Sequence, residues 1–319
     1  MKQKSITVSV IIPAYNEAGN LPVLIPLVVS ELKKSLRKNE TYELLVIDDG
    51  SIDETPKQLK TLQQKYKELY SIRFSRNFGH QSALMAGLEL AVGECVISMD
   101  ADLQHPPKLL STLLLHWRKG KKVVYTVRRD PDSASILKRF SSRFFYIVFR
   151  FLSGVSLDPG VADFRLLDRK VVDVVKTMSE STMFLRGIIA WAGFDSVAVP
   201  YIASKRFRGT SQYTIIKMLK LAVGGITSFS VRPLYMMVVC GILLSVVSGM
   251  YGVYAVIMFL LYGKFVLPGW ASIISSVLFI GGVQLILLGV VGIYIGNIYI
   301  ETKRRPRYII DSINAKKVK

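Results

Sequence analysis

The chain has 319 residues, a formal net charge of +19 and a hydrophobic fraction of 50%, with a mean hydropathy of +0.35. This hydropathy is too high for a wholly soluble enzyme, and its source is local, because Lys264 is the only charged residue between positions 233 and 300. The composition excludes a purely soluble chain and predicts a charged domain followed by a membrane part. No nucleic-acid-binding motif accompanies the charge, so an anionic membrane surface or an anionic substrate explains it better.

The first half of the chain alternates short apolar runs with longer amphipathic stretches. The runs predict strands at Thr7–Ile12, Tyr42–Ile47, Tyr70–Phe74, Cys95–Met99 and Lys122–Thr126. The stretches between them predict helices at Ala18–Lys38, Glu54–Tyr66, His80–Ala91 and Pro106–Lys119. This strict alternation indicates an α/β domain whose mainly parallel sheet has helices on both faces. Ligands bind such sheets at the carboxyl ends of the strands.

Three polar motifs directly follow three of these predicted strands. They are PAYNE at 13–17, DDGSID at 48–53 and DADLQHPP at 100–107. All three are therefore expected where an α/β sheet binds its ligand. The second motif admits two compatible interpretations. Ser51 and Asp53 suit the cap of the following helix, whereas Asp48 or Asp49 can accept a hydrogen bond from a nucleobase.

The third motif has the composition of a metal site. Asp100 and Asp102 are separated by one residue, and Gln104 supplies an amide oxygen, so the three can converge on one hard cation in a turn. Such oxygens suit Mg²⁺ or Mn²⁺, which often share sites with substrate phosphates. A D-x-D triplet alone is a weak signal, but this one follows an apolar strand and is closed by two prolines. The histidines lack zinc-ligand spacing, so His80 and His105 are interpreted as supporting residues.

Two later segments combine basic residues with aromatic or aliphatic ones. Residues 138–152 read KRFSSRFFYIVFRFL, and residues 213–230 mix Lys217 and Lys220 with isoleucine, leucine and phenylalanine. Each segment suits a packed helix or a helix in the membrane interface, with cations toward head groups and aromatic rings toward acyl chains. We favour interfacial helices at about 138–152 and within 211–232, because a membrane span follows closely.

Two uncharged runs then predict a membrane hairpin. Each run, from Pro233 to Gly263 and from Phe265 to Ile300, exceeds the ~20 residues that cross the hydrocarbon core. Helices are expected at about 234–262 and 271–299, followed by a basic tail at 301–319. Lysines and arginines flank both ends of the hairpin, so the positive-inside rule places the α/β domain and both chain ends in the cytoplasm.

The remaining features agree with a cytoplasmic α/β domain. No signal peptide precedes the first apolar run, so the domain is expected to stay on the side where it is made. The two cysteines, Cys95 and Cys240, lie in a strand-like run and in the membrane run, and we expect no disulfide between them.

The order of the motifs closely resembles one family. PAYNE, DDGSID, SRNFGHQSALMAG, DADLQHPP, ADFRLLDR and RFRGTS, followed by a two-span hairpin, are similar to the family 2, GT-A-fold polyisoprenyl-phosphate glycosyltransferases. The hairpin makes the bactoprenol glucosyltransferases of O-antigen modification more similar than the dolichyl-phosphate mannose synthases. The resemblance covers nearly the whole chain.

This resemblance implies a fold and a reaction. A GT-A catalytic domain is expected at 1–210. The expected reaction is inverting transfer of a hexose, glucose from UDP-glucose by preference, to undecaprenyl phosphate at the cytoplasmic face of the inner membrane. UDP-N-acetylglucosamine and GDP-mannose stay open as donors. The resemblance also implies a divalent cation, a possible homotetramer, and a flippase and downstream transferase as partners.

The resemblance assigns most of the expected roles to residues on the donor side. The nucleoside would be held by Pro13, Tyr15, Glu17 and Asp49, with Asp49 on the base. The ribose and diphosphate would be lined by Asp100, Ala101 and Asp102, and the metal would be bound by Asp102, Gln104 and Asp100. Arg128 would face the donor. Arg206 and Ser211 match an R-x-x-G-x-S loop that closes over the diphosphate, although Gln212 stands where relatives often have lysine.

On the acceptor side, the resemblance identifies Asp163 as the position often assigned as the catalytic base. A phosphate monoester has a second pKa near ~6 and is largely dianionic at neutral pH, so it barely needs a base. Orienting an arginine or the sugar is at least as good an interpretation of Asp163. Arg139, Arg143 and Arg208 are candidates for binding the acceptor phosphate, and plain attraction to anionic lipid explains them equally well.

Three rival classes have less support. A processive polysaccharide synthase would need more spans and a Q-x-x-R-W motif. A small transporter would need more than two spans and a charged residue within them. A non-catalytic membrane anchor or scaffold is disfavoured by the intact D-A-D-x-Q set.

Overall fold

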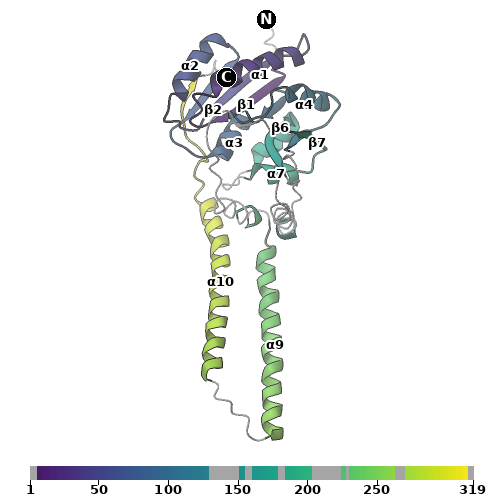
Figure 1. Cartoon of the computed structure of the whole chain (residues 1–319), viewed down its shortest axis with the longest axis vertical. Coiled ribbons are helices and arrows are strands. Elements are labelled where there is room, and N and C mark those ends of the chain that lie inside the picture. Colours follow the sequence, from purple (N-terminus) through teal and green to yellow (C-terminus); the bar gives the residue numbers. More distant parts are fainter. Residues whose placement is uncertain are drawn as a thin grey trace.

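The computed structural model describes residues 6–128, 151–154, 160–178, 184–202, 224–227, 230–262 and 270–314. Figure 1 shows an α/β domain from one side of which two long helices project. The interfacial helices expected at 138–152 and within 211–232 lie outside the described residues, except for the short pieces at 151–152, 224–227 and 230–232.

A mixed eight-stranded sheet forms the centre of the domain, in the order β7-β5-β6-β4-β1-β2-β3-β8. The strands are β1 Val8–Ala14, β2 Tyr42–Asp48, β3 Leu69–Phe74, β4 Cys95–Ser98, β5 Val123–Arg128, β6 Val161–Asp168, β7 Ser196–Tyr201 and β8 Ile310–Asn314. Four of the seven neighbouring pairs are parallel, and β6 and β8 run antiparallel to their neighbours. The predicted α/β class and its five predicted strands are confirmed.

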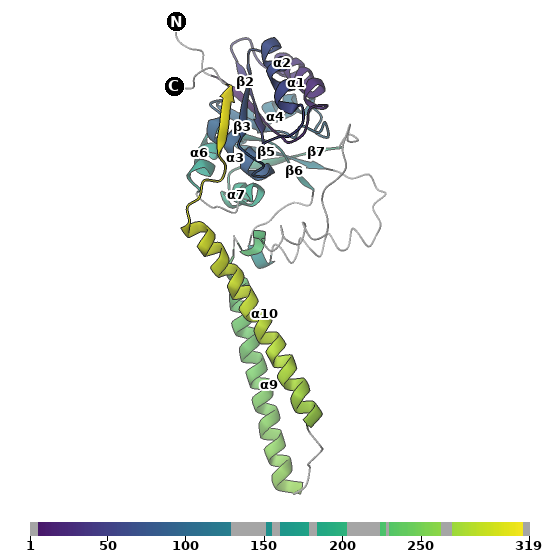
Figure 2. The same cartoon turned by 90° about the vertical axis from the view of Figure 1, so that its left-hand side faces the viewer.

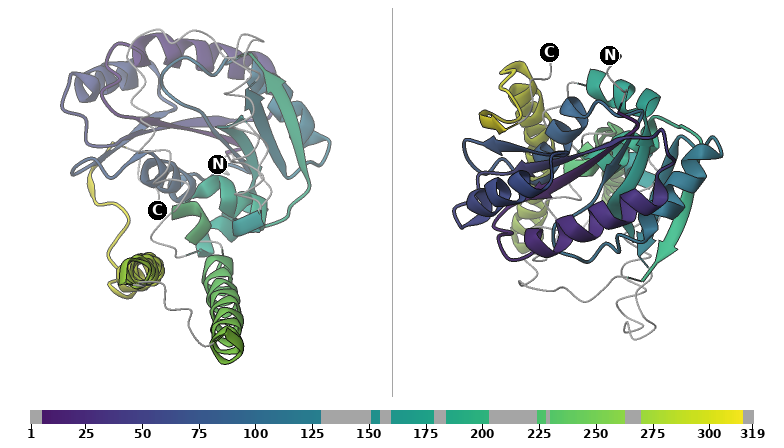
Figure 3. Two further views of the ribbon diagram at one scale, coloured as in Figure 1. Left: turned by 60° about the horizontal axis from the view of Figure 1, so that its bottom comes forward. Right: turned by 90° about the horizontal axis from the view of Figure 1, so that it is seen from above.

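Helices cover both faces of this sheet. They are α1 Leu21–Ser35, α2 Thr55–Lys65, α3 His80–Leu90, α4 Leu109–Arg118, α6 Arg169–Thr177 and α7 Leu185–Trp191. Helices α1, α2 and α4 pack in one core layer, and α3, α6 and α7 pack in the other. In the left panel of Figure 3 the purple α1 lies above the strands, and blue and teal helices lie below them. Consecutive strand residues serve opposite layers, as Val10 and Ile11 do in β1.

The helices form where apolar residues recur at helical spacing and give the helix one buried face. In α1, Leu21, Leu24, Ile25 and Val28 recur at helical spacing and are all fully buried. Each such side chain contributes about 1.5–3 kcal/mol when it leaves water, which gives α1 one fixed face against the sheet. Packing against this face fixes the positions of β1, β2 and β4, and therefore also the positions of the loops at their carboxyl ends.

Three strands lie outside the sequence-based prediction. In β6, every residue from Asp163 to Asp168 is buried, including the charged Asp163 and Arg165. Because β6 contains these charged residues, its sequence lacks the continuous apolar run by which the other buried strands were predicted. The strand β8 lies within the segment that was expected to be only a basic tail, 301–319.

The two long helices are α9 Arg232–Tyr262 and α10 Trp270–Thr302, which confirms the predicted pair at about 234–262 and 271–299. Their most apolar stretches have mean hydropathies of 2.1 and 2.4, and 0% of each is buried. Helices of the core of a soluble protein would be covered, whereas these expose isoleucine, leucine and valine along their length. Such surfaces are stable only against an apolar medium, so the chain associates with a membrane.

After α10 the chain returns to the α/β domain. Strand β8, coloured yellow in Figure 2, pairs antiparallel with β3 at the edge of the sheet. The backbone N–H of Ser75 donates to Ile309 O over 3.0 Å, and Gln63 Nε2 donates to Asn314 O over 3.1 Å. The end of the second apolar helix is thereby attached to the sheet within a few residues.

Candidate active site

The first two motifs are joined by hydrogen bonds at the carboxyl ends of β1 and β2. The backbone N–H of Asn16 donates to Ser51 Oγ over 2.9 Å, and the N–H of Ile52 donates to Asn16 Oδ1 over 3.0 Å. The N–H of Glu17 donates to Thr55 Oγ1 over 2.8 Å. Neighbouring parallel strands end at the same edge, and these bonds fix the two loops as one unit.

Gly50 allows the second motif to turn there. Its φ of +69° lies in the left-handed region, and a Cβ atom would come within 2.4 Å of the backbone carbonyl carbon of Arg76. Glycine is the residue that accepts both constraints.

The residues that are expected to hold the nucleoside differ in how exposed they are. Pro13 is buried in β1, whereas Tyr15 is 41% exposed. Glu17 accepts a hydrogen bond from Asn20 Nδ2 over 2.5 Å. Tyr15 is therefore the member of this group that presents a surface to a ligand.

Asp49 holds the loop that leads into α3. Its two carboxylate oxygens accept the backbone N–H groups of Phe78, over 2.7 Å, and Gly79, over 2.9 Å. Burial raises the pKa of Asp49 despite these bonds. Both oxygens already have protein partners, so the expected contact with a nucleobase stays a prediction that would add a further hydrogen bond to a carboxylate in use.

The third motif forms a tight turn after β4. Asp102 Oδ1 accepts the N–H of Gln104 over 3.1 Å, and Leu103 has a φ of +63°. The N–H of Asp100 donates to His105 Nδ1 over 3.0 Å, which leaves the ring proton on Nε2. The buried ring of His105 stacks on Phe164, with centroids 5.1 Å apart. His105 thus holds the turn against the core, in agreement with its expected supporting role.

The antiparallel direction of β6 brings Asp163 to this same edge. Ser98, at the end of β4, is paired with Arg165, and Ser98 Oγ donates to Asp163 O over 2.5 Å. Asp163 lies two residues before Arg165, beside the loop that begins with Asp100. A parallel strand would have placed its first residues at the opposite edge.

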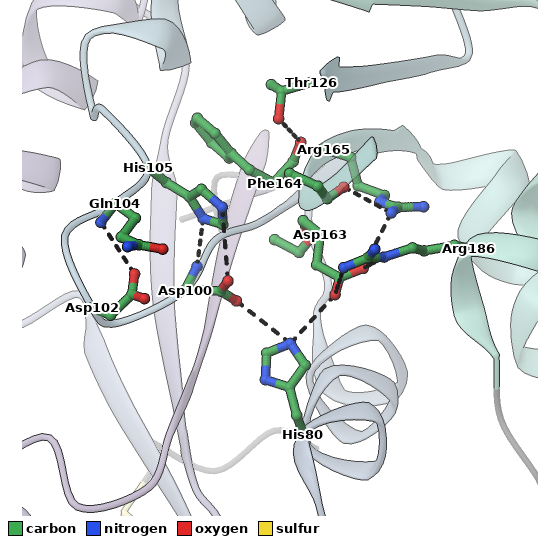
Figure 4. Close-up of polar contacts among 12 residues, drawn as sticks. His80, Asp100, Asp102, Gln104, His105, Thr126, Asp163, Phe164, Arg165 and Arg186 are labelled. Carbon is green, nitrogen blue, oxygen red and sulfur yellow. Dashed lines mark hydrogen bonds and ion pairs between the residues drawn. The ribbon is translucent and has the colours of Figure 1, made fainter. Parts of the chain in front are cut away.

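His80, the first residue of α3, lies between the two aspartates (Figure 4). Its Nε2 is 3.4 Å from Asp100 Oδ1 and 3.6 Å from Asp163 Oδ2. Burial lowers the pKa of an imidazole, but the hydrogen bond to Asp163 and the charge of Asp100 outweigh it, so the pKa of His80 is raised. A charged His80 reduces the repulsion between the two carboxylates.

Asp163 also binds two arginines. Arg186 of α7 donates from Nε to Oδ1 and from Nη2 to Oδ2, each over 2.8 Å, in a bidentate pair. Arg165 Nη2 lies 3.2 Å from Oδ1. Burial raises the pKa of a carboxyl group, yet Arg186, together with His80 and Arg165, holds the pKa of Asp163 well below its ordinary value. Asp163 is therefore a weak proton acceptor.

Arg128 and Tyr201 close the site on the side of β5 and β7. The two residues are paired in register at the ends of these strands, and the side chain of Arg128 is exposed. Burial raises the pKa of Tyr201 to about 12, and the charges of Arg128, Asp100 and Asp102 also act on it. The expected donor-side residues Arg128, Asp100 and Asp102 thus share one neighbourhood.

Five of the expected site residues cannot be placed. Arg139, Arg143, Arg206, Arg208 and Ser211 lie outside the described residues. Their expected roles toward the diphosphate and the acceptor phosphate therefore stay predictions.

The D-x-D turn suits a divalent cation in the donor set that it offers. Within the described ranges, no three His, Cys, Asp or Glu side chains form a metal cluster on their own. Asp100 Oδ1 is buried and, apart from the 3.4 Å contact with His80 Nε2, accepts no hydrogen bond in the described structure, and the oxygens of Asp102 and Gln104 belong to the same turn. Mg²⁺ commonly takes one or two carboxylates and completes its shell with waters and substrate phosphates. The residues fit a cation shared with a diphosphate.

His80, Arg165 and Arg186 contact Asp163, and the sequence interpretation assigned none of them to it. His80 and Arg165 lie within motifs that the sequence made conspicuous, SRNFGHQ and ADFRLLDR. Arg186 lies in the segment FLRGII, which offered no signal, and only the packing of α7 against the sheet brings it to Asp163.

Residues 9–176 match the family described as Glycosyl transferase family 2. The chain belongs to this family. An uncharacterized glycosyltransferase of Synechocystis sp. is 38% identical over 97% of this chain and 96% of that protein. A bactoprenol glucosyl transferase of Shigella phage SfV is 38% identical over 95% of this chain and 97% of its own length. The solved structure of S. aureus TarS with UDP-GlcNAc aligns with 70% of this chain and 66% of its own, at 16% identity and a TM-score of 0.48.

The family assignment explains the position of the site. The matched range contains the three motifs, His80 and Asp163, whereas Arg186 lies beyond it. As a family 2 glycosyltransferase, the protein is an enzyme that transfers a sugar. The polar cluster at the carboxyl edge of the sheet, from Tyr15 through Asp102 to Asp163, is its candidate active site.

Proposed function

We propose that this glycosyltransferase moves a hexose, glucose from UDP-glucose by preference, onto a polyprenyl phosphate of undecaprenyl type, with inversion at the anomeric carbon. The observation that carries the proposal is the combination of a family 2 site with an apolar helix pair on one side of the domain (Figure 2). The identity of 38% to a bactoprenol glucosyl transferase over almost both full lengths supports the acceptor class.

The two apolar helices would keep the enzyme at the membrane, where its proposed lipid acceptor lies. A polyprenyl tail leaves the bilayer at a cost of about 0.8 kcal/mol per CH₂ group, so the enzyme has to work where the lipid phosphate lies. Helices α3 and α7, which carry His80 and Arg186, lie on the side of the domain from which α9 and α10 project (Figures 1 and 2). In the proposed complex, the acceptor side of the site would therefore face the lipid head groups.

The proposed orientation places the catalytic domain and both flanks of the hairpin in the cytoplasm. Strand β8 follows α10 and pairs with β3 of the catalytic domain, so the segments before α9 and after α10 belong to one side. The basic residues there, among them Arg232, Lys303 and Arg304, favour the cytoplasmic leaflet.

In the proposed reaction, an oxygen of the lipid phosphate attacks the anomeric carbon. The bond from that carbon to the nucleoside diphosphate breaks, and its electron pair leaves with the diphosphate. Direct displacement gives a β-linked product from an α-linked donor. The attacking phosphate is largely dianionic at neutral pH, so the depressed pKa of Asp163 is no obstacle.

A divalent cation bound by Asp102, Gln104 and Asp100 would stabilise the negative charge that develops on the leaving diphosphate. The side chains of this turn have a second task, which is to keep the diphosphate in line with the attacking phosphate. Arg128, exposed at the end of β5, would add positive charge on the donor side.

The experiment is transfer of label from a panel of UDP- and GDP-sugars to undecaprenyl phosphate, with purified protein in detergent, first with Mn²⁺ and then with EDTA. We expect one labelled lipid, formed with UDP-glucose and lost with EDTA. A labelled lipid from UDP-N-acetylglucosamine or GDP-mannose instead would keep the reaction class and correct the sugar. Folded protein that labels no lipid with any donor would overturn the proposed transfer to a polyprenyl phosphate.

A further inference from the structure

We propose that Arg186 binds the phosphate of the acceptor and that Asp163 is the residue that positions it. This inference rests on the proposed function and assigns the acceptor-phosphate subsite to a residue of α7. Its starting point is the bidentate pair, in which both oxygens of Asp163 are bonded to Arg186 over 2.8 Å.

The two arginines that contact Asp163 differ in how accessible their side chains are to a ligand. The side chain of Arg165 is 3% exposed, and its Nη2 also donates to Ala162 O over 2.8 Å. The side chain of Arg186 is 35% exposed. Arg165 therefore acts as a buried counter-charge, whereas Arg186 combines a fixed guanidinium with access to a ligand.

The position of Arg186 separates it from the donor side. In Figure 4, Asp102 and Gln104 lie on one side of Asp100, whereas Arg186 lies beyond Asp163 on the other. Helix α7 is held against the sheet by the buried Leu185 and Ile188. It also lies on the side of the domain from which the apolar helices project. An acceptor whose tail stays beside the apolar helices would therefore approach from the side of the domain on which α7 lies.

The chemistry of the pair suits a phosphate dianion. A guanidinium carries its N–H donors in a planar fork that matches phosphate oxygens. Asp163 alone would repel a dianion. With Arg186 and Arg165 beside it, its charge is offset and the local field favours an anion. Asp163 thus acts through Arg186, because it fixes the orientation of the Arg186 guanidinium.

The test compares Arg186→Gln and Arg186→Lys with wild-type protein. It measures kcat and KM for undecaprenyl phosphate at saturating UDP-glucose, and the affinity for UDP by calorimetry. Loss of a charge-assisted contact predicts a kcat/KM for the lipid about 10- to 100-fold lower in Arg186→Gln. We expect the UDP affinity to change by less than about 2-fold, and Arg186→Lys to be intermediate because lysine keeps the charge without the fork.

Lys121→Gln is a matched control. Lys121 is a cation of the same domain, 38% exposed, with two contacts of 3.0 Å to the carboxylate of Asp195. It resembles Arg186 in exposure and pairing but lies outside the candidate site, so its variant should keep the wild-type kinetics for lipid and donor.

Asp163→Asn tests the positioning role. We expect it to lower kcat/KM for the lipid by a factor similar to that of Arg186→Gln, with the shape of the pH profile unchanged. The double variant should then be little worse than either single one, because the two residues act as a unit. Multiplying effects would show that Asp163 has a role independent of Arg186 and would overturn that half of the inference.

The failures are distinguishable. Wild-type protein that labels no lipid would refute the proposed function itself. An active wild type with an unchanged lipid KM and kcat in Arg186→Gln would refute the inference alone. A loss of UDP affinity by the same factor as the lipid effect would assign Arg186 to the donor diphosphate.

Discussion

Tyr308, six residues after the end of α10, stacks on Phe74 of β3 with ring centroids 4.9 Å apart and an interplanar angle of 12°. Its hydroxyl donates to Glu89 of α3, and Arg307 forms an ion pair with the same glutamate, with Nη1 and Oε1 3.5 Å apart. The helix that begins with His80 is therefore bound at its other end to the segment that emerges from the membrane helix. The active site and the anchor share one structural element.

Removal of this stack should weaken the domain. Tyr308→Ala deletes the ring contact and the hydrogen bond to Glu89, and we expect the free energy of unfolding to fall by about 2–3 kcal/mol. Tyr308→Phe keeps the stack and should lose only about 1 kcal/mol. Thermal unfolding of the purified protein in detergent measures both. Equal melting temperatures for Tyr308→Ala and wild type would mean that the tail contributes nothing to stability.

The D-x-D turn should be essential for transfer and dispensable for folding. Asp102→Asn keeps the shape of the side chain but removes the charge that a divalent cation needs, so we expect a loss of transfer of ~100-fold or more. Circular dichroism and detergent gel filtration should be unchanged, because Asp102 is partly exposed. Near-normal turnover of this variant in Mg²⁺ or Mn²⁺ would remove Asp102 from the proposed metal site.

The pH dependence should separate Asp163 from a general base. Its pKa is depressed in the folded protein, so the stability it contributes is present above its unfolded pKa of about 3.9 and is lost as the pH falls through the lower folded value. The difference in melting temperature between wild type and Asp163→Asn should therefore persist from pH 8 down to pH 5, and it should grow as the pH falls, because Asp163 also raises the pKa of His80. A difference that disappears between pH 7 and pH 5 would contradict the depressed pKa.

Gly50 and Gly120 offer a matched test of the close approach at the second motif. Both have positive φ, +69° and +95°, but a Cβ atom at Gly120 meets nothing within 4 Å, whereas one at Gly50 meets the backbone of Arg76. Gly120→Ala should cost about 1 kcal/mol from backbone strain alone. Gly50→Ala should cost clearly more and should also lower donor affinity, because Tyr15 and Asp49 depend on this loop. Equal losses in the two variants would show that the loop at Gly50 can move without cost.

Local patterns were enough to predict the first four β–α units and the two apolar helices. The spacing of Leu21, Leu24 and Ile25 shows a helix with one buried face, and PAYNE, DDGSID and DADLQHPP mark strand ends by their abrupt polarity. Each of these signals lies within about a dozen residues of sequence. The family resemblance extended them to a reaction class, which the match over residues 9–176 confirms as far as glycosyl transfer.

The relationships around Asp163 could not be predicted in the same way. They depend on β6 entering the sheet antiparallel between β4 and β5, and on α7 packing so that Arg186 reaches back 23 positions. No periodicity encodes either event. The chemistry of the expected acceptor argues against a base at Asp163, and this stays a prediction. The arginines that surround Asp163 became identifiable only in three dimensions.

The pairing of β8 with β3 also determines when the sheet can be completed during synthesis. Strand β3 leaves the ribosome early, but its outer edge stays without its partner until both apolar helices and the segment after them have been made. An unpaired strand edge can pair with other chains, and this edge of the sheet remains open until the segment after α10 has been made. A chain whose second helix failed to return would leave β8 across the bilayer from β3. In the proposed orientation, β8 can therefore complete the sheet only when the two apolar helices return the chain to the side of the catalytic domain.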